Sequence, residues 1–183
     1  MERTVVNGIE LFFDAEERET ADLVGRACEK SAQLLLNHWG LATPADCRVY
    51  VMPSWRHFIF HSAPWPWRVP LAISMPLWAP SARKKWGLAG GWAQQYGQRC
   101  AIGVKPAHLI HMADRRLGER IFIRETDVND KVRHITCHEL THGFTQHLRL
   151  PIWLHEGLAM LAVDKFSGKP TVRLETLDVL SRE

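Results

Sequence analysis

The sequence predicts a single domain of the α+β class, in which helices pack against a sheet. Two observations support this prediction. Apolar residues recur at helical spacing in two long segments, residues 15–38 and 129–166, and short alternating segments with strand character lie between them. The chain has 183 residues, of which 46% are hydrophobic, and this is enough apolar material for one core of ordinary size.

The N-terminal part, residues 1–125, is predicted to hold one long helix and most of the strands. Residues 9–14 (IELFFD) read as a short strand. The following helix is predicted over residues 15–38, with Asp14 as its N-cap and Gly40 as the residue that ends it.

The middle of the chain changes character. Residues 47–53 (CRVYVMP) alternate like a strand, and Ser54 is a suitable N-cap for a short helix after it. Residues 63–92 are rich in Pro, Trp and Gly, so we expect an irregular segment there. Residues 99–106 (RCAIGVKP) and 119–125 (ERIFIRE) are predicted strands.

The C-terminal part, residues 126–183, is predicted to hold two helices and a tail. The first helix spans residues 129–148 and starts at Asn129 or Asp130. The second runs from Pro151 to Phe166, because proline is favoured in a first turn and Gly168 follows the apolar pattern. The tail, residues 171–180, has the pattern of a last short helix.

Composition excludes several classes of function. The net charge of +3 is small and evenly spread, so we expect no nucleic-acid partner. No segment has the ~20 apolar residues of a membrane span, and the acidic N-terminus does not resemble a signal peptide, so we expect a cytoplasmic protein with no membrane partner. The four cysteines are far apart, which indicates reduced and mostly buried thiols. The oligomeric state is not indicated.

The motif HELTH, at residues 138–142, carries the main chemical signal. Histidines four residues apart lie on one face of a helix, so His138 and His142 can reach the same ion. Glu139 projects to the side, where it can act on water without binding the metal. Thirteen residues separate Glu156 from His142, a spacing that lets a second helix return beside the first. Two histidines and a glutamate form a known catalytic zinc site.

An HExxH pattern can also be a solvent-facing helix that merely carries His and Glu. Its chance expectation in a chain of this composition is about 0.04, so coincidence is a weak explanation. Apolar neighbours such as Leu140 and Phe144 also predict a largely buried helix, where unpaired His and Glu would be costly. We expect His155 to lie on the rim of the site and Cys137 to be a buried thiol.

HELTHGFTQH followed by PIWLHEGLAML resembles the gluzincin branch of the zincin metallopeptidases, in particular the small minigluzincins. The resemblance implies that one Zn²⁺ is bound by His138, His142 and Glu156, that Glu139 is the general base, and that the substrate is a peptide or protein. It also implies a zincin-like fold, in which an edge strand lies above the HExxH helix and a glutamate helix follows. We expect residues 99–106 to be that edge strand, with an ordinary core strand as the alternative.

Two features depart from the family pattern. Many gluzincins have an aspartate four residues after the glutamate ligand, and here that residue is Met160. The family also commonly uses a downstream Tyr or His to stabilise the oxyanion, but neither residue follows Glu156. We therefore select Tyr96 as the candidate oxyanion donor, because it precedes the expected edge strand.

The sequence thus favours a zinc metallopeptidase. The alternative is a zincin-fold binding or scaffold protein, or a latent peptidase, in which zinc is structural and residues 63–92 or the tail close the cleft.

Overall fold

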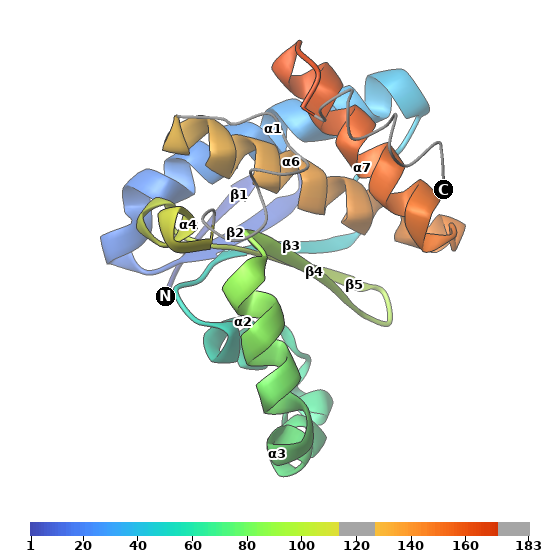
Figure 1. Cartoon of the computed structure of the whole chain (residues 1–183). Coiled ribbons are helices and arrows are strands. Elements are labelled where there is room, and N and C mark those ends of the chain that lie inside the picture. The colour runs from blue at the N-terminus through green and yellow to red at the C-terminus, as the bar shows by residue number, and fades with distance from the viewer. Residues whose placement is uncertain (114–126, 172–183) are drawn as a thin grey trace, which may run out of the picture.

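The computed structural model describes residues 1–113 and 127–171, and these form one five-stranded sheet with helices on both faces (Figure 1). The predicted α+β class is confirmed. The predicted strand at residues 119–125, and the predicted tail helix beyond Thr171, lie outside the described residues. Within the described part of the chain, no helix is both long and apolar enough to cross a bilayer.

The sheet is mixed and has the order β1-β2-β3-β5-β4. Its central strands β2, β3 and β5 are parallel, while β1 and β4 pair antiparallel with their neighbours at the two edges. The strands are β1 (Glu2–Val6), β2 (Ile9–Phe13), β3 (Asp46–Val51), β4 (Gly91–Tyr96) and β5 (Arg99–Val104).

The expectation that residues 99–106 form the edge strand is wrong, because β5 is paired on both sides. The edge strand is β4, which begins at Gly91 within the segment predicted to be irregular. A tight turn at Gly97, with φ of 62°, folds β4 back onto β5 and makes this hairpin possible.

Three long helices cover one face of the sheet: α1 (Arg18–Trp39), α6 (Val128–Thr145) and α7 (Ile152–Ser167) (Figure 1). A short helix, α4 (Ala107–Ala113), packs beside α6. The main core lies between these helices and the strands, and it includes Leu35, Leu140 and Phe144 from the helices and Val49 and Ile102 from the sheet.

The helix ends follow the predictions in part. Helix α1 ends at Gly40, whose φ of 66° lies in the left-handed region, as predicted. Asp14 is not its cap, because a 3₁₀ turn (Ala15–Glu17) comes first and the Asp14 side chain forms no capping hydrogen bond. Helix α6 is capped by Asp127 rather than by Asn129 or Asp130, and the Asp127 carboxylate accepts from the Asn129 N–H at 2.7 Å.

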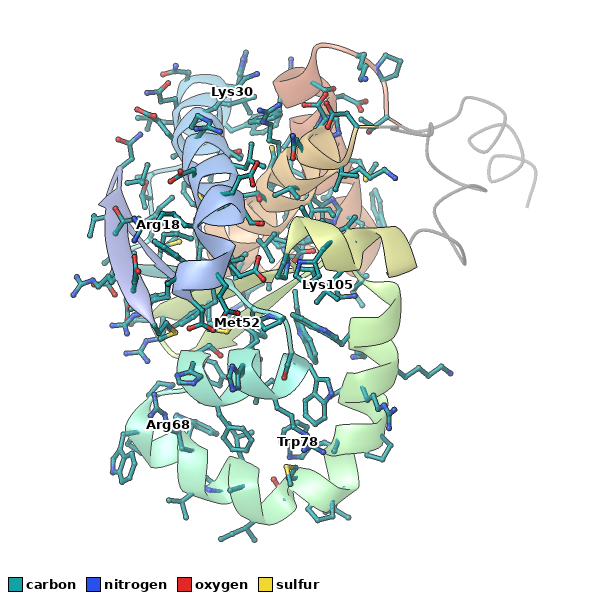
Figure 2. The ribbon with its side chains drawn as sticks, turned by 90° about the vertical axis from the view of Figure 1, so that its left-hand side faces the viewer. Arg18, Lys30, Met52, Arg68, Trp78 and Lys105 are labelled. Atoms are coloured by element: carbon teal, nitrogen blue, oxygen red, sulfur yellow. The ribbon has the colours of Figure 1, made fainter. Side chains whose placement is uncertain are left out.

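The other face of the sheet carries α2 (Trp55–Ser62) and α3 (Trp65–Leu88). Ser54 caps α2 as predicted, accepting from the His57 N–H at 3.4 Å. The prediction of an irregular segment over residues 63–92 is wrong, since most of it is the helix α3 despite three internal prolines. Figure 2 shows α3 running beneath α2 past Arg68, turning near Trp78, and then rising toward the sheet.

Packing explains why α3 is helical. Trp78, Ala82 and Trp86 are spaced four residues apart and face a second apolar cluster on this side of the sheet. The Trp78 ring packs edge-on against Trp55 at 5.6 Å between centroids, and Trp86 stacks on Phe58 at 6.4 Å. Burial of these large rings offsets the free-energy cost of the backbone hydrogen bonds that the prolines cannot donate.

Candidate metal centre

Helix α6 places His138 and His142 one turn apart on the same face, as their spacing predicted. Their Nε2 atoms are 3.0 Å apart, and the rings are nearly perpendicular. The helix is fixed against the sheet immediately after these residues. Gly143 packs so closely on β5 that a Cβ there would lie 2.3 Å from the Cys100 Sγ atom. The histidines are thus presented by a helix whose position the core determines.

Helix α7 brings Glu156 to the two histidines. One carboxylate oxygen lies 3.3 Å from the His138 Nε2 atom, and the other lies 3.4 Å from the His142 Nε2 atom. Two ligands bound tetrahedrally to zinc at their usual bond lengths are about 3.3 Å apart. The three separations within this trio are close to that value, so the donor atoms already have the spacing that one zinc ion requires.

The trio opens to solvent on one side. The Glu156 side chain is 55% exposed, whereas those of His138 and His142 are 21% and 11% exposed. The His142 Nδ1 atom is buried and has no hydrogen-bond partner within the described part of the chain. Met160 stands where many gluzincins have an aspartate, and its side chain has no carboxylate to accept a hydrogen bond from a histidine ligand.

The electrostatics of the trio suit a cation. Burial lowers the pKa of His142 to about 4, aided by the nearby charge of His138, so its imidazole is neutral at pH 7. Burial opposes a charge on His138, but the hydrogen bond to Glu156 and the neighbouring carboxylates outweigh it and raise its pKa. The hydrogen bond from His138 lowers the pKa of Glu156. His138 and Glu156 thus stabilise each other's charged forms, and a divalent cation bound by both would replace the His138 proton in this pairing.

Glu139 lies beside the trio and against the edge strand β4. Burial raises the pKa of its carboxyl to about 7, and a hydrogen bond from the backbone of Ala93 partly opposes this shift. A Cβ at Gly91 would lie 2.6 Å from the Glu139 Cγ atom, so only glycine leaves room for the side chain here. A carboxyl whose pKa is close to the working pH is suited to accept and return a proton.

His155 contributes a contact that the sequence did not reveal. It was expected on the rim, but its Nε2 atom lies 2.8 Å from the Thr145 Oγ1 atom and 3.3 Å from the His142 carbonyl oxygen. The Thr145 hydroxyl donates to the Thr141 carbonyl, so His155 is the donor to Thr145. Since His155 adjoins Glu156, this bond ties the start of α7 to the end of α6. The only sequence signal for this contact was that His155 immediately precedes Glu156.

Tyr96 is not brought to the trio. It pairs with Arg99 across the β4–β5 hairpin, and side chains of directly paired residues point to the same face. Arg99 donates to the Ser62 carbonyl of α2, and Tyr96 packs against the cluster beneath α2 and α3. The sheet therefore separates the Tyr96 hydroxyl from Glu156, and the oxyanion role predicted for Tyr96 is corrected on this ground.

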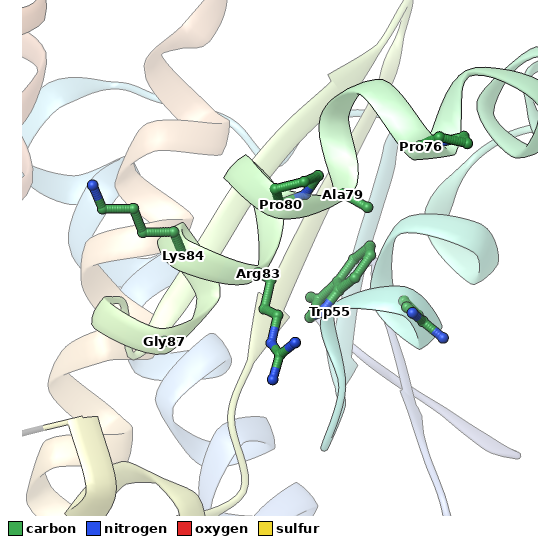
Figure 3. Close-up of a pocket in the computed structure, with 8 residues that line it drawn as sticks. Trp55, Pro76, Ala79, Pro80, Arg83, Lys84 and Gly87 are labelled. Atoms are coloured by element: carbon green, nitrogen blue, oxygen red, sulfur yellow. The ribbon is translucent and has the colours of Figure 1, made fainter.

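A cleft also opens on the far face of the sheet. Its volume is about 650 Å³, and it lies between α2 and α3, where Trp55, Pro80 and Arg83 line it (Figure 3). None of the three candidate metal ligands lines this cleft.

The four cysteines are buried free thiols, and burial raises the pKa of Cys137 to about 11, as expected for a structural side chain.

No family model, no curated protein and no solved structure matches this chain. The interpretation of the site therefore rests on its residues. Within the described part of the chain, His138, His142 and Glu156 form a group that could hold a metal ion, with all three donor atoms within 4.8 Å of one another.

Proposed function

We propose that this chain is a zinc-dependent metallopeptidase of the gluzincin type. The observation that carries the proposal is the trio of His138, His142 and Glu156, whose donor atoms have tetrahedral spacing. Two imidazoles and one carboxylate are the ligands of catalytic zinc sites that keep one position open. The exposed side of Glu156 is consistent with access from solvent.

Zinc bound by this trio would act as a Lewis acid on a peptide carbonyl and would lower the pKa of water. The chain itself supplies the proton transfer. Glu139 is adjacent to the first ligand in sequence but is not one of the three, so its carboxylate is available to accept a proton and later give it to the leaving amine. Its raised pKa makes both steps accessible near neutral pH.

The edge strand β4 supports a peptide as the substrate. Among the described residues its one strand partner is β5, which leaves its other side available to an extended chain within this part of the structure, and its first residue lies against Glu139. Strand addition at such an edge is a common way to hold a peptide backbone. In this proposal β4 takes the place that the sequence assigned to residues 99–106, and the arrangement with α6 and α7 is zincin-like.

The alternative of a scaffold protein with an occluded cleft is less favoured. That alternative gave residues 63–92 the role of a plug, yet α3 occupies residues 65–88 and packs on the opposite face of the sheet. This helix does not cover the ligands. The predicted tail helix, which was the other candidate for a plug, lies outside the described residues.

Metal analysis of the purified protein, followed by cleavage of a broad peptide library with and without a chelator, tests the proposal. We expect about one zinc per chain and cleavage that the chelator abolishes. Glu139→Gln should retain zinc but lose about 10²-fold or more in turnover. Glu29→Gln, at an exposed position of α1, is the matched control and should behave like the parent. Full activity in Glu139→Gln would reject the mechanism, and zinc without any cleavage would favour the scaffold.

A further inference from the structure

The outward face of α3 is apolar throughout its first four turns. Between Trp65 and Pro80, every exposed residue is apolar. The large side chains on it, here called the α3 apolar face, are Trp65, Trp67, Val69, Ile73 and Leu77, and each is at least 55% exposed. Four of them are spaced four residues apart, so they form one continuous stripe. Monomeric soluble proteins rarely expose a continuous apolar patch of this kind, so the stripe indicates contact with another apolar surface or phase.

The charge around this face has one sign. From Cys47 to Ala113 the sequence contains no Asp or Glu, although the whole chain has 20 of them. The same segment contains eight Lys and Arg residues, and three of these, Arg83, Lys84 and Lys85, lie in the last two turns of α3. The segment of residues 47–113, which includes the α3 apolar face, is therefore positively charged.

Cations also line the cleft between α2 and α3. Trp55, Arg83 and Lys84 are among the residues that line it, and the Lys84 side chain points away from Trp55 (Figure 3). The Arg56 guanidinium lies over the Trp55 ring, 5.3 Å from its centroid. Among the described residues, no carboxylate forms an ion pair with Arg56, Arg83 or Lys84. These cations are thus available to an external anion.

We propose that the α3 apolar face is a membrane-docking surface that lies on an anionic bilayer. Tryptophan, isoleucine and leucine would enter the boundary between headgroups and acyl chains, and Arg83 and its neighbours would attract the lipid phosphates. The contact is interfacial, because no described helix can cross a bilayer. This proposal revises two expectations from the sequence, that the charge is evenly spread and that the chain has no membrane partner.

Charge and shape favour a bilayer over a second copy of the chain. Two copies joined through this face would bring together two lobes that lack any acidic residue over residues 47–113. The stripe is also the outer surface of a helix, and none of its five large side chains lines the cleft between α2 and α3, the kind of pocket in which a protein partner would bury its side chains. A fluid bilayer needs no such pocket.

Co-sedimentation with vesicles tests the proposal. The probes are vesicles of phosphatidylcholine alone and of phosphatidylcholine mixed with phosphatidylglycerol. We expect the chain to bind the mixed vesicles more strongly, and to lose affinity as salt is raised. Ile73→Glu and Leu77→Glu should each weaken binding by about tenfold or more, since their exposed side chains lose their burial in lipid. Replacing Arg83 and Lys84 by Gln should cost about fivefold per cation on the mixed vesicles.

Leu36→Glu is the matched control, because Leu36 is 53% exposed and belongs to α1, which lies on the other face of the sheet (Figure 1). This variant should bind vesicles like the parent. Binding should also be insensitive to chelators, so a failure here is separate from a failure of the metal site. Equal binding of the parent and Leu77→Glu would overturn the proposal. A dimer that Leu77→Glu converts to a monomer in analytical ultracentrifugation would assign the face to a second copy instead.

Discussion

Gly91 allows Glu139 to lie against the edge strand, and replacing it by alanine tests the position of the proposed base. A Cβ at residue 91 would lie 2.6 Å from the Glu139 Cγ atom and 2.9 Å from the Ile135 Cγ2 atom. An ordinary contact begins at 3.4 Å, so the Glu139 side chain must move by about 0.8 Å. Gly91 has no positive φ, so the substitution acts through this overlap and not through backbone strain.

The expected loss follows from that displacement. A catalytic group misplaced by about 1 Å can lose 10²-fold in rate, so we expect Gly91→Ala to lower kcat by about 10²-fold. Overpacking should also lower the free energy of unfolding by about 1 to 3 kcal/mol. The candidate zinc ligands are not among the atoms nearest to the added methyl group, so zinc content should stay at the parental value.

The assay combines peptide cleavage, zinc content and thermal unfolding on the same preparations. Gly87→Ala is the matched control, because a Cβ at residue 87 meets nothing within 4 Å, and it should retain full activity. Parental turnover in Gly91→Ala would refute the assignment of Glu139 as a base held by β4. A loss of zinc along with activity would show instead that the whole site had been displaced.

Three further predictions concern the metal, the core and pH. Alanine in place of any ligand, such as His142→Ala, should remove zinc, and at zinc concentrations near 100 times Kd the lost stabilisation of about 2.7 kcal/mol should lower Tm by roughly 5 to 10 °C. Gly143→Ala should destabilise the chain in denaturant unfolding, and adding Cys100→Ala should restore much of the loss, because the Sγ atom makes the overlap. Burial opposes the charge of Asp46, but hydrogen bonds from Arg99 and Arg48 lower its pKa below 3.8. The charged carboxylate therefore stabilises the folded state above pH 3.8, and this stabilisation is lost as the pH falls through the folded pKa. Asp46→Asn should remove this dependence of the unfolding free energy on acid.

The sequence predicted the features that a single helix determines. Helical spacing alone places His138 and His142 on one face, and Pro151 and Gly168 mark the ends of the helix that carries Glu156. The meeting of the two helices was predicted from the length of the connection, and the structure shows donor atoms at 3.3 and 3.4 Å. Local periodicity was sufficient because the ligands lie on two consecutive helices.

Features that depend on distant residues were missed. The prolines of α3 predicted an irregular segment, since the sequence does not show that Trp78 and Trp86 pack on Trp55 and Phe58 of another helix. The strand β4 was missed because it begins at Gly91, directly after Gly90, and glycines are poor strand residues, yet close packing on α6 requires both glycines. In both segments tertiary packing overrides the local preference of the residues.

The assignment of Tyr96 failed for a related reason. A strand alternates its side chains between two faces, so a position one residue away from the correct one points to the wrong side of the sheet. Ala93 contacts Glu139 through its backbone and packs against the core beneath α6, so Gln95 shares its face while Tyr96 points to α2. The pairing of Gln95 with Cys100, whose Sγ atom faces Gly143, places the same face of β4 toward α6. Among the described residues, a donor for the negative charge that the proposed reaction develops would therefore come from the Gln95 side of β4 or from α6 and α7, because the sheet separates a hydroxyl on the Tyr96 side from the candidate ligands.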